Sequence, residues 1–417
     1  MNPPPAKAAP PARRVPMAAT NLAPGEARRL LAPAGPKKDR YEVVVIGGGA
    51  IGLAIAFELA KLGVTDVLVL DKDSLVKGAT GRNGGGVRAQ WTSAENIQLA
   101  KRSIEAFRHF AQDTGHNVFL RQGGYLFLTR SEAQLAALRK AAAFQNEHGV
   151  RTRVISLDEA QRIVPGLNTH GCVGATFNPD DAVLFPWPLV WGWKEAAEKL
   201  GVEVATFTQA TGLEVSGGRI TAVRTDRGTI GCHWLVNAAG AWSRDLAKWV
   251  GLDLPVKPER HEILVSEPLK PFLDPMLVDL SNGYYVNQDM RGELVGGLGT
   301  HTEESMDWHS SLDFAREFAK TTVRLLPRLG PVRVLRQWAG SYDKTPDAKP
   351  ILGVADAGPF NLVQANGFSG HGMMVSPMVG RLVAQLIAGQ KPELELRRFA
   401  LERFARGEVE ADPLVIG

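Results

Sequence analysis

The stretch YEVVVIGGGAIG, residues 41–52, decides the fold of this chain. Its first half is an apolar run rich in β-branched residues, which predicts a strand buried on both faces of a sheet. Glycines at the Gly-x-Gly-x-x-Gly spacing follow directly, and residues 53–62 predict a helix that ends at Gly63. A second apolar strand, residues 67–70, ends on Asp71. Together these segments predict one compact βαβ unit.

This unit predicts a dinucleotide site, because each glycine has its own task at that spacing. Gly47 permits the tight turn, Gly49 lets the backbone approach a pyrophosphate, and Gly52 lets helix and strand pack closely. The start of the helix faces the phosphates with free N–H groups and a partial positive charge. Asp71 stands where an acid binds the ribose hydroxyls, which disfavours a 2′-phosphate and therefore NADP.

Three later segments indicate that the dinucleotide is a flavin. Residues 78–88, GATGRNGGGVR, are dense in glycine, which implies backbone lying against a flat ligand. Residues 236–242, VNAAGAW, end a strand in small side chains. Residues 365–374, ANGFSGHGMM, repeat the strand–glycine–helix design. The dipole of that last helix would point at a group that becomes anionic, as a reduced isoalloxazine does.

The remaining segments predict a second domain inserted into the first. Apolar runs at 234–239 and 360–365 read as further strands of the first sheet. Residues 124–129 read as a strand, and 131–148 as an amphipathic helix capped by Ser131. The 259–300 region alternates apolar and polar residues, which suits an antiparallel sheet. We therefore predict an α/β protein whose Rossmann-like FAD-binding domain (41–123, 186–254 and 331–417) is interleaved with an α+β substrate domain on a largely antiparallel sheet (124–185 and 255–330).

Composition narrows the class of protein. Residues 1–40 hold nine prolines, eight basic residues and two acidic ones. This arm therefore has a net charge of +6, and because the whole chain has a net charge of +4, residues 41–417 have a net charge of −2. We expect the arm to be disordered or to dock on a partner, with Met17 as a possible alternative start, and we expect no nucleic-acid partner. Two cysteines, Cys172 and Cys232, are too few for a disulfide framework or a Cys-rich metal site. No apolar run predicts a membrane span or a hydrophobic leader, which makes a cytoplasmic protein the expectation.

The motifs resemble those of the D-amino-acid oxidase superfamily of flavoenzymes. Five separated motifs occur in the family's order: residues 47–52 with Asp71, 80–83, 237–242, 338–340 with 345–347, and 367–372. Within that superfamily the chain looks most like the β subunits of heteromeric sarcosine oxidase and dye-linked L-proline dehydrogenase. The resemblance runs from about Tyr41 to Gly417 and leaves the arm outside.

The resemblance implies bound FAD and hydride transfer from the carbon beside an amine nitrogen to flavin N5. The product is an imine that water hydrolyses, and no side-chain base is strictly required if the amine enters neutral. The expected cofactor-binding residues are Gly47, Gly49, Ala50, Ile51, Gly52, Asp71, Lys72, Thr80, Arg82, Asn83, Gly85, Gly86, Ala210, Ala239, Gly240, Trp242, Gly340, Gly367, Phe368, Ser369, Gly370, His371, Gly372 and Met373.

The resemblance also nominates substrate-side residues. Arg88 is the candidate for binding a substrate carboxylate, because a planar guanidinium matches it; a cofactor-contacting or salt-bridged structural arginine is the alternative. Tyr285 is expected to form a wall over the flavin, with core packing as the alternative. His261, Trp338 and Met374 are expected to line the substrate pocket, although His261 also fits an ordinary packed histidine.

Departures from the family pattern refine the expectation. Gly340 stands where monomeric sarcosine oxidases have a cysteine that attaches the flavin, so FAD should be non-covalent. Pro186 stands where heteromeric sarcosine oxidases hold FMN through a histidine, so any FMN at a subunit interface should be non-covalent too. Val295 and Met374 replace lysines, one of them associated with oxygen activation, which removes a cation that would support superoxide formation.

These departures favour a dehydrogenase for a small secondary amino acid, such as proline or an N-methyl glycine, working as the β-type subunit of a hetero-oligomer. Electrons would pass to another flavin, a quinone or a partner subunit. Three alternatives stay open: a self-sufficient D-amino-acid or glycine oxidase-like enzyme, a flavin-holding scaffold subunit, and an NAD-dependent opine dehydrogenase.

Overall fold

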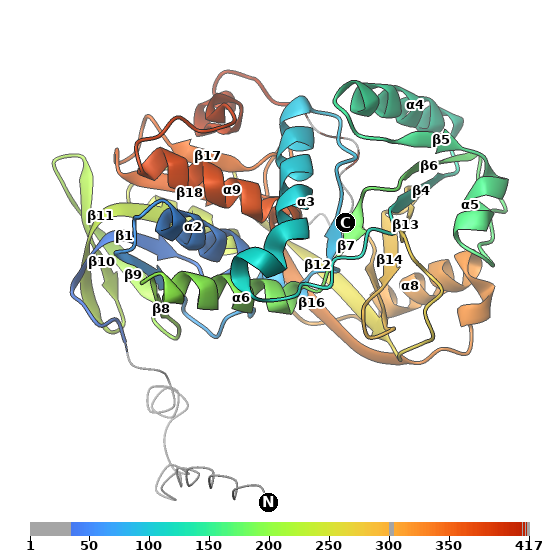
Figure 1. The fold of residues 1–417 in the computed structure, drawn as a ribbon, viewed down its shortest axis with the longest axis horizontal. Coiled ribbons are helices and arrows are strands. Elements are labelled where there is room, and N and C mark those ends of the chain that lie inside the picture. The colour runs from blue at the N-terminus through green and yellow to red at the C-terminus, as the bar shows by residue number, and fades with distance from the viewer. Residues whose placement is uncertain (1–34, 300–303, 411, 413, 415–417) are drawn as a thin grey trace, which may run out of the picture. The chain divides into compact units, whose positions relative to one another are not determined.

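The computed structural model describes residues 35–299, 304–410, 412 and 414 (Figure 1). Met17 and most of the predicted arm lie outside the described residues. Residues 35–40, which we had assigned to the arm, pack on the first sheet instead. Lys38 Nζ lies 2.7 Å from Asp66 Oδ1, and the Lys37 backbone N–H donates to Glu203 Oε1 at 2.8 Å. The first sheet therefore includes contacts from residues that precede Tyr41.

The first sheet has the strand order β17-β18-β11-β1-β2-β8. All neighbours along this path are parallel except β17 and β18, which are antiparallel. An antiparallel extension, β9 and β10, pairs with the early part of β11. The strands are β1 (Arg40–Ile46), β2 (Val67–Leu70), β8 (Glu203–Ala205), β9 (Ala210–Ser216), β10 (Arg219–Thr225), β11 (Gly228–Asn237), β17 (Ile351–Val354) and β18 (Leu362–Asn366).

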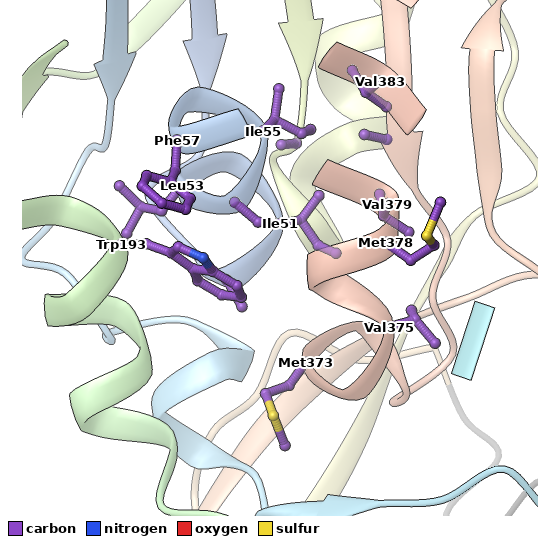
Figure 2. Packing of buried hydrophobic residues seen from close by; sticks show 14 of the residues in the cluster. Ile51, Leu53, Ile55, Phe57, Trp193, Met373, Val375, Met378, Val379 and Val383 are labelled. Atoms are coloured by element: carbon purple, nitrogen blue, oxygen red, sulfur yellow. The ribbon is translucent and has the colours of Figure 1, made fainter. Parts of the chain in front are cut away.

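Both faces of this sheet are buried, as the continuous apolar run of β1 predicts. Val43 and Val45 face a core made with helices α2 (Ala50–Lys61), α3 (Ala94–Thr114), α6 (Pro186–Lys199) and α9 (Gly372–Ile387). Val44 and Ile46 face a second core formed with β9 and β10. Figure 2 shows the first core, where Ile51 and Ile55 of α2 lie toward Val379 and Val383 of α9, and Trp193 of α6 approaches Leu53.

The second sheet has the order β16-β12-β15-β14-β13-β4-β6-β5, and every neighbouring pair except β13 and β4 is antiparallel. It carries helices α4 (Glu132–Glu147), α5 (Leu157–Ile163) and α8 (Leu312–Leu325), on the right in Figure 1. Its strands are β4 (Tyr125–Thr129), β5 (Arg153–Ile155), β6 (Gly174–Asn178), β12 (Lys257–Ser266), β13 (Met276–Asp279), β14 (Tyr284–Gln288), β15 (Leu294–Gly297) and β16 (Val334–Lys344).

Short elements complete the chain. They are β3 (Gly86–Val87), β7 (Ala182–Val183), α7 (Ser243–Lys248) and the 3-10 helices η2 (Ala79–Arg82), η3 (Gly240–Trp242), η4 (Pro327–Leu329), η5 (Leu396–Phe399) and η6 (Leu401–Arg403). β3 and β7 pair with each other between the two large sheets (Figure 1).

The predicted fold class is confirmed, and the predicted strands and helices are present with shifted ends. Helix α2 starts three residues earlier than predicted, because the turn at Gly47–Gly49 leads straight into it. Ser131 caps α4 as predicted by accepting a hydrogen bond from the Gln134 N–H. The domain boundaries stay a prediction; β16, inside the range assigned to the FAD-binding domain, pairs with β12 in the second sheet. Within the described ranges, no helix combines the length and apolar character needed to cross a bilayer.

Candidate functional site

The glycines of the βαβ turn occupy positions where a larger residue would not fit. Gly47 has φ +117°, and a Cβ there would lie 2.2 Å from the Ala238 carbonyl oxygen of the neighbouring strand's end. A Cβ on Gly52 would lie 1.9 Å from the Gly47 oxygen. Gly49 is different, since a Cβ there would meet only Thr80 Oγ1, at 3.2 Å. The open side of Gly49 is what a pyrophosphate needs in order to approach the backbone.

Asp71 closes the far end of the turn. Its Oδ2 accepts a hydrogen bond from the Gly48 N–H at 2.9 Å, and its Oδ1 accepts one from the Asp73 N–H at 2.8 Å. Burial raises the pKa of this carboxyl, while the two N–H donors act in the opposite direction. Beside it, Lys72 Nζ lies 3.4 Å from the ring centroid of Trp242.

A cavity of about 380 Å³ begins at this turn and runs between the two sheets. Most predicted cofactor residues line it, including Ala50 and Ile51 of α2 and Ala210 of β9, and so does the predicted substrate residue His261. Gly340 also borders it, and neither cysteine of the chain does. Among the predicted cofactor residues, Gly52, Gly367 and Ser369 pack behind the wall, whereas Gly85, Gly86 and His371 border a second, smaller cavity.

Trp308 is a wall residue of the large cavity that sequence reasoning missed. Its Nε1–H donates to Ser341 Oγ at 2.8 Å, and its ring meets Trp242 edge-on at 5.7 Å. The Arg82 guanidinium lies 4.3 Å from the Trp308 ring centroid, and Arg82 also donates to the Ala339 carbonyl at 2.7 Å. Trp308 stands in a connection without a glycine motif, so only the folded chain brings it to the site.

The turn before α9 is held by a buried acid of β16. Asp343 accepts a hydrogen bond from the Gly367 N–H at 2.8 Å, and its carbonyl accepts one from the Ser369 N–H at 3.1 Å. Ser369 has φ +51°, so this turn is strained without such support. Burial raises the pKa of Asp343 to about 6, opposed by the N–H donors of the turn. Asp343 therefore positions the N-terminus of α9 against the cavity.

The second cavity, of about 60 Å³, adjoins the turn at residues 83–86. That the glycines of this turn lie against a flat ligand stays a prediction, and all three border the second cavity. On their other side, a Cβ on Gly84 would lie 3.0 Å from the Tyr285 ring, and one on Gly86 would lie 1.8 Å from the Tyr125 hydroxyl. Glycine is favoured at these two positions because tyrosines of the second sheet pack directly on the backbone there. Gly85 is required by its φ of +76°.

Tyrosines and a histidine form the floor between the two cavities. His261 stacks on Tyr342 and on Tyr285 at centroid distances of 4.7 and 5.7 Å. His261 Nε2 lies 2.8 Å from the Tyr285 hydroxyl, and Gly297 leaves the space for this contact. Burial raises the pKa of Tyr285 well above its usual value, so its hydroxyl stays neutral. Sequence reasoning nominated Tyr285 and His261 and missed Tyr342 and Tyr125.

Arg88 borders the second cavity and is fully buried, with 1 % of its surface exposed. It donates to the backbone carbonyls of Gln90 and Leu414, the latter from Nη2 at 2.6 Å, and its guanidinium lies 3.8 Å from the Trp91 ring centroid. No aspartate or glutamate among the described residues forms an ion pair with it. The salt-bridged structural alternative therefore does not describe its contacts in this part of the chain.

Three further candidates, His371, Trp338 and Met374, differ in whether they border the second cavity. His371 Nε2 lies 3.5 Å from Arg88 Nη2, and burial together with the Arg88 charge lowers the pKa of His371 well below its usual value. The imidazole is thus neutral and presents an acceptor to Arg88. Trp338, predicted in the substrate pocket, borders neither cavity; its Nε1–H donates to the Arg82 carbonyl at 3.0 Å. Met374 does border the second cavity.

The fold and the cavity define a dinucleotide-binding α/β oxidoreductase. The chain belongs to the DAO family, described as FAD dependent oxidoreductase, which it matches over residues 42–386. This decides for FAD over a nicotinamide dinucleotide. No group of three or more His, Cys, Asp or Glu able to hold a metal ion occurs among the residues that the structure describes.

Known relatives and structures are similar along nearly the whole chain. Sarcosine oxidase subunit beta from Rhizobium meliloti is 31% identical over 376 residues, covering 89% of this chain and 90% of that protein. L-proline dehydrogenase from P. horikoshii has a TM-score of 0.85 and 32% identity, with 89% of this chain and 100% of that chain covered. Glycine oxidase from Geobacillus kaustophilus has a TM-score of 0.81 and 27% identity, with 88% and 99% covered. The resemblance to the sarcosine oxidase β subunit and to proline dehydrogenase is confirmed.

Proposed function

We propose that this protein is an FAD-dependent dehydrogenase that oxidises the C–N bond of a small secondary amino acid, such as proline or sarcosine, to an imine. The observation that carries the proposal is Arg88, a buried cation on the wall of the second cavity. Its described hydrogen bonds end on two backbone carbonyls and a neutral imidazole, none of which carries a negative charge. An unpaired buried charge is costly, so a protein retains one where a ligand supplies the opposite charge. A carboxylate would replace the Leu414 carbonyl with a stronger, charge-assisted bond.

The FAD site is supported by the open side of Gly49, the pocket along α2 and the N-terminus of α9. FAD supplies the acceptor for the hydride of the amine carbon. Arg88 would orient the carboxylate, and the neutral hydroxyls of Tyr285 and Tyr342 would border the rest of the substrate. The small volume of the second cavity, about 60 Å³, suits a small amino acid. No Asp or Glu lines that cavity among the described residues, so the amine would enter neutral.

We propose a dehydrogenase rather than an oxidase because the described lining of the second cavity contains no lysine. Met374 borders this cavity at one of the two positions where the resemblance places a lysine in the monomeric oxidases. Val295, at the other position, packs among Ile263 and Val265 of the second sheet. Glycine oxidase is also among the similar structures, so peroxide formation by the purified protein in air decides between the two. Brisk peroxide release on addition of the reducing amino acid would overturn the dehydrogenase assignment.

We also propose that the chain assembles with a second subunit, that FMN binds at their interface, and that neither flavin is attached covalently. The similarity to a protein named sarcosine oxidase subunit beta supports a partner. Pro186, at the position matched to an FMN-attaching histidine, starts α6, and Trp187 and Trp191 on this helix are 45% and 40% exposed. Exposed tryptophans one helical turn apart are typical of a contact surface. Release of flavin by acid without proteolysis would support non-covalent attachment.

The catalytic proposal is tested by anaerobic addition of an amino-acid panel to the flavin-loaded protein, with the visible flavin band as readout. We expect a secondary amino acid to bleach the native protein and R88Q to require a much higher concentration. R316Q, at an exposed pair on α8, is the matched control and should behave as native. If no amino acid bleaches the flavin, the scaffold alternative replaces the enzyme.

A further inference from the structure

Arg88 has a buried companion of opposite charge that it does not touch. Asp181, which directly precedes β7, is 0% exposed, and Arg88 is 1% exposed. Neither forms an ion pair with a described residue. Direct contact would stabilise both charges, so their separation needs an explanation.

One residue, Gln90, connects the two charges. Asp181 Oδ2 accepts a hydrogen bond from Gln90 Nε2 at 2.9 Å, and the Gln90 carbonyl accepts one from Arg88 Nη1. Asp181 Oδ1 accepts from the Ala89 N–H and from Asn178 Nδ2, both at 2.7 Å. Ala89 and Gln90, the two residues that follow Arg88, therefore hold the Asp181 carboxylate in place. The side of Arg88 that borders the second cavity is left for another anion.

A bound substrate carboxylate changes the charge balance of this buried group. Without ligand, the Arg88 guanidinium lies near two buried carboxyls, Asp181 and Asp412. With an anion on Arg88, an ionised Asp181 would be a further negative charge beside one cation, in a medium that screens charges poorly. We propose that Asp181 is the buried counter-charge of Arg88 and takes up a proton when an anionic substrate binds. The inference rests on the proposed role of Arg88 in binding a carboxylate.

The titration of the surrounding groups agrees with this assignment. Burial raises the pKa of Asp181 to about 7, against the N–H donors of Ala89 and Gln90 and the charge of Arg88. Tyr125 and Asp412 also act on Arg88 electrostatically, and burial raises the pKa of Tyr125 far above neutral. His371, next to Arg88, has its pKa lowered well below its usual value. Of Asp181, Tyr125 and His371, only Asp181 changes charge near neutral pH.

The test uses the flavin-loaded full chain and cyclopentanecarboxylate, which has the ring shape and carboxylate of proline but no amine to oxidise or titrate. Its dissociation constant is measured from the flavin spectrum between about pH 6 and about pH 8. Because pH 8 lies about one unit above the pKa of Asp181, we expect the native protein to bind the ligand about tenfold more weakly at pH 8 than at acidic pH, where Asp181 is already protonated. D181N should bind with little pH dependence and about tenfold more tightly than native at pH 8.

The sign of this change separates a charge effect from structural damage, which would weaken binding at every pH. D180N is the control, since Asp180 is the adjacent acid, paired at the surface with Arg151, and should keep the native profile. Calorimetry in two buffers of different ionisation heat needs no variant. We expect native protein to take up close to one proton per ligand near pH 8 and almost none at the acidic limit.

The outcomes distinguish the two proposals. If R88Q leaves the affinity unchanged, Arg88 does not bind the carboxylate and the proposed substrate site is wrong. If R88Q abolishes binding while native protein takes up no proton, or D181N follows the native pH profile, Arg88 stands and the role of Asp181 is overturned.

Discussion

Arg403 and Asp347 form a buried ion pair that ties the end of the chain to the cofactor turn. The side chains are 1% and 0% exposed, and they meet through two hydrogen bonds, Nε to Oδ2 at 2.8 Å and Nη2 to Oδ1 at 3.0 Å. Arg403 also donates to the carbonyls of Phe399 and Lys349. On the same loop as Asp347, the Thr345 N–H donates to Ser369 Oγ, so the pair supports the turn before α9.

Replacing Arg403 by Met should therefore destabilise the protein strongly. It leaves the Asp347 carboxylate buried without a cation, and breaking such a pair from one side costs about 3–5 kcal/mol. Removing both partners, as R403M/D347L, should recover part of the loss because no buried charge then remains. The measurement is the denaturant midpoint of flavin release and of loss of helical signal, followed separately since two sheets need not unfold together.

The matched control is R316M, which breaks an exposed pair with Asp313 on α8 and should change stability by less than about 0.5 kcal/mol. A cost below about 1 kcal/mol for R403M would refute the reasoning, since the carboxylate would then be solvated or protonated without penalty. A double variant that is less stable than R403M would also contradict it.

Three shorter predictions follow from the site. G52A should yield protein without bound flavin, because its Cβ would lie 1.9 Å from the Gly47 oxygen. The control G330A, whose Cβ would lie 3.5 Å from the nearest atom, should keep the native flavin content, and the ratio of flavin to protein absorbance measures both. Burial raises the pKa of Asp343 from 3.8 to about 6, so native stability relative to D343N should fall by about 2 kcal/mol as pH rises from about 4 to about 6. Denaturant midpoints at the two pH values measure this difference, and a constant difference would exclude the titration. W308A should weaken flavin binding about tenfold by removing the cover over the cavity, with substrate KM unchanged in flavin excess; an unchanged flavin Kd would show that Trp308 does not cover the cofactor.

The βαβ unit and its cofactor class were predictable from the sequence because their determinants are local. A buried strand, a glycine turn and a helix occupy consecutive residues 40–61. Gly47 is favoured there by its own φ of +117°, and Gly52 by the Gly47 oxygen five residues earlier. The same holds for Ser131, whose capping bond is made three residues away. Such short-range requirements appear directly as residue types at fixed spacings.

The substrate side was only partly predictable because it is assembled across long sequence separations. Arg88 meets Leu414 from 326 residues away, and Arg82 meets Ala339 from 257. The glycines at 84 and 86 illustrate the difference: the sequence predicted a small-residue turn, but the tyrosines that require it stand on strands β14 and β4.

Sequence thus determined the strand–glycine–helix units and the cofactor they suit, because these depend on backbone geometry over a few residues. The tertiary structure alone decided that Trp338 borders neither cavity, that Trp308 lines the large one, and that Asp181 is linked to Arg88 through Gln90. Those relations depend on how two sheets pack around one cavity, and no local pattern of residues encodes that packing.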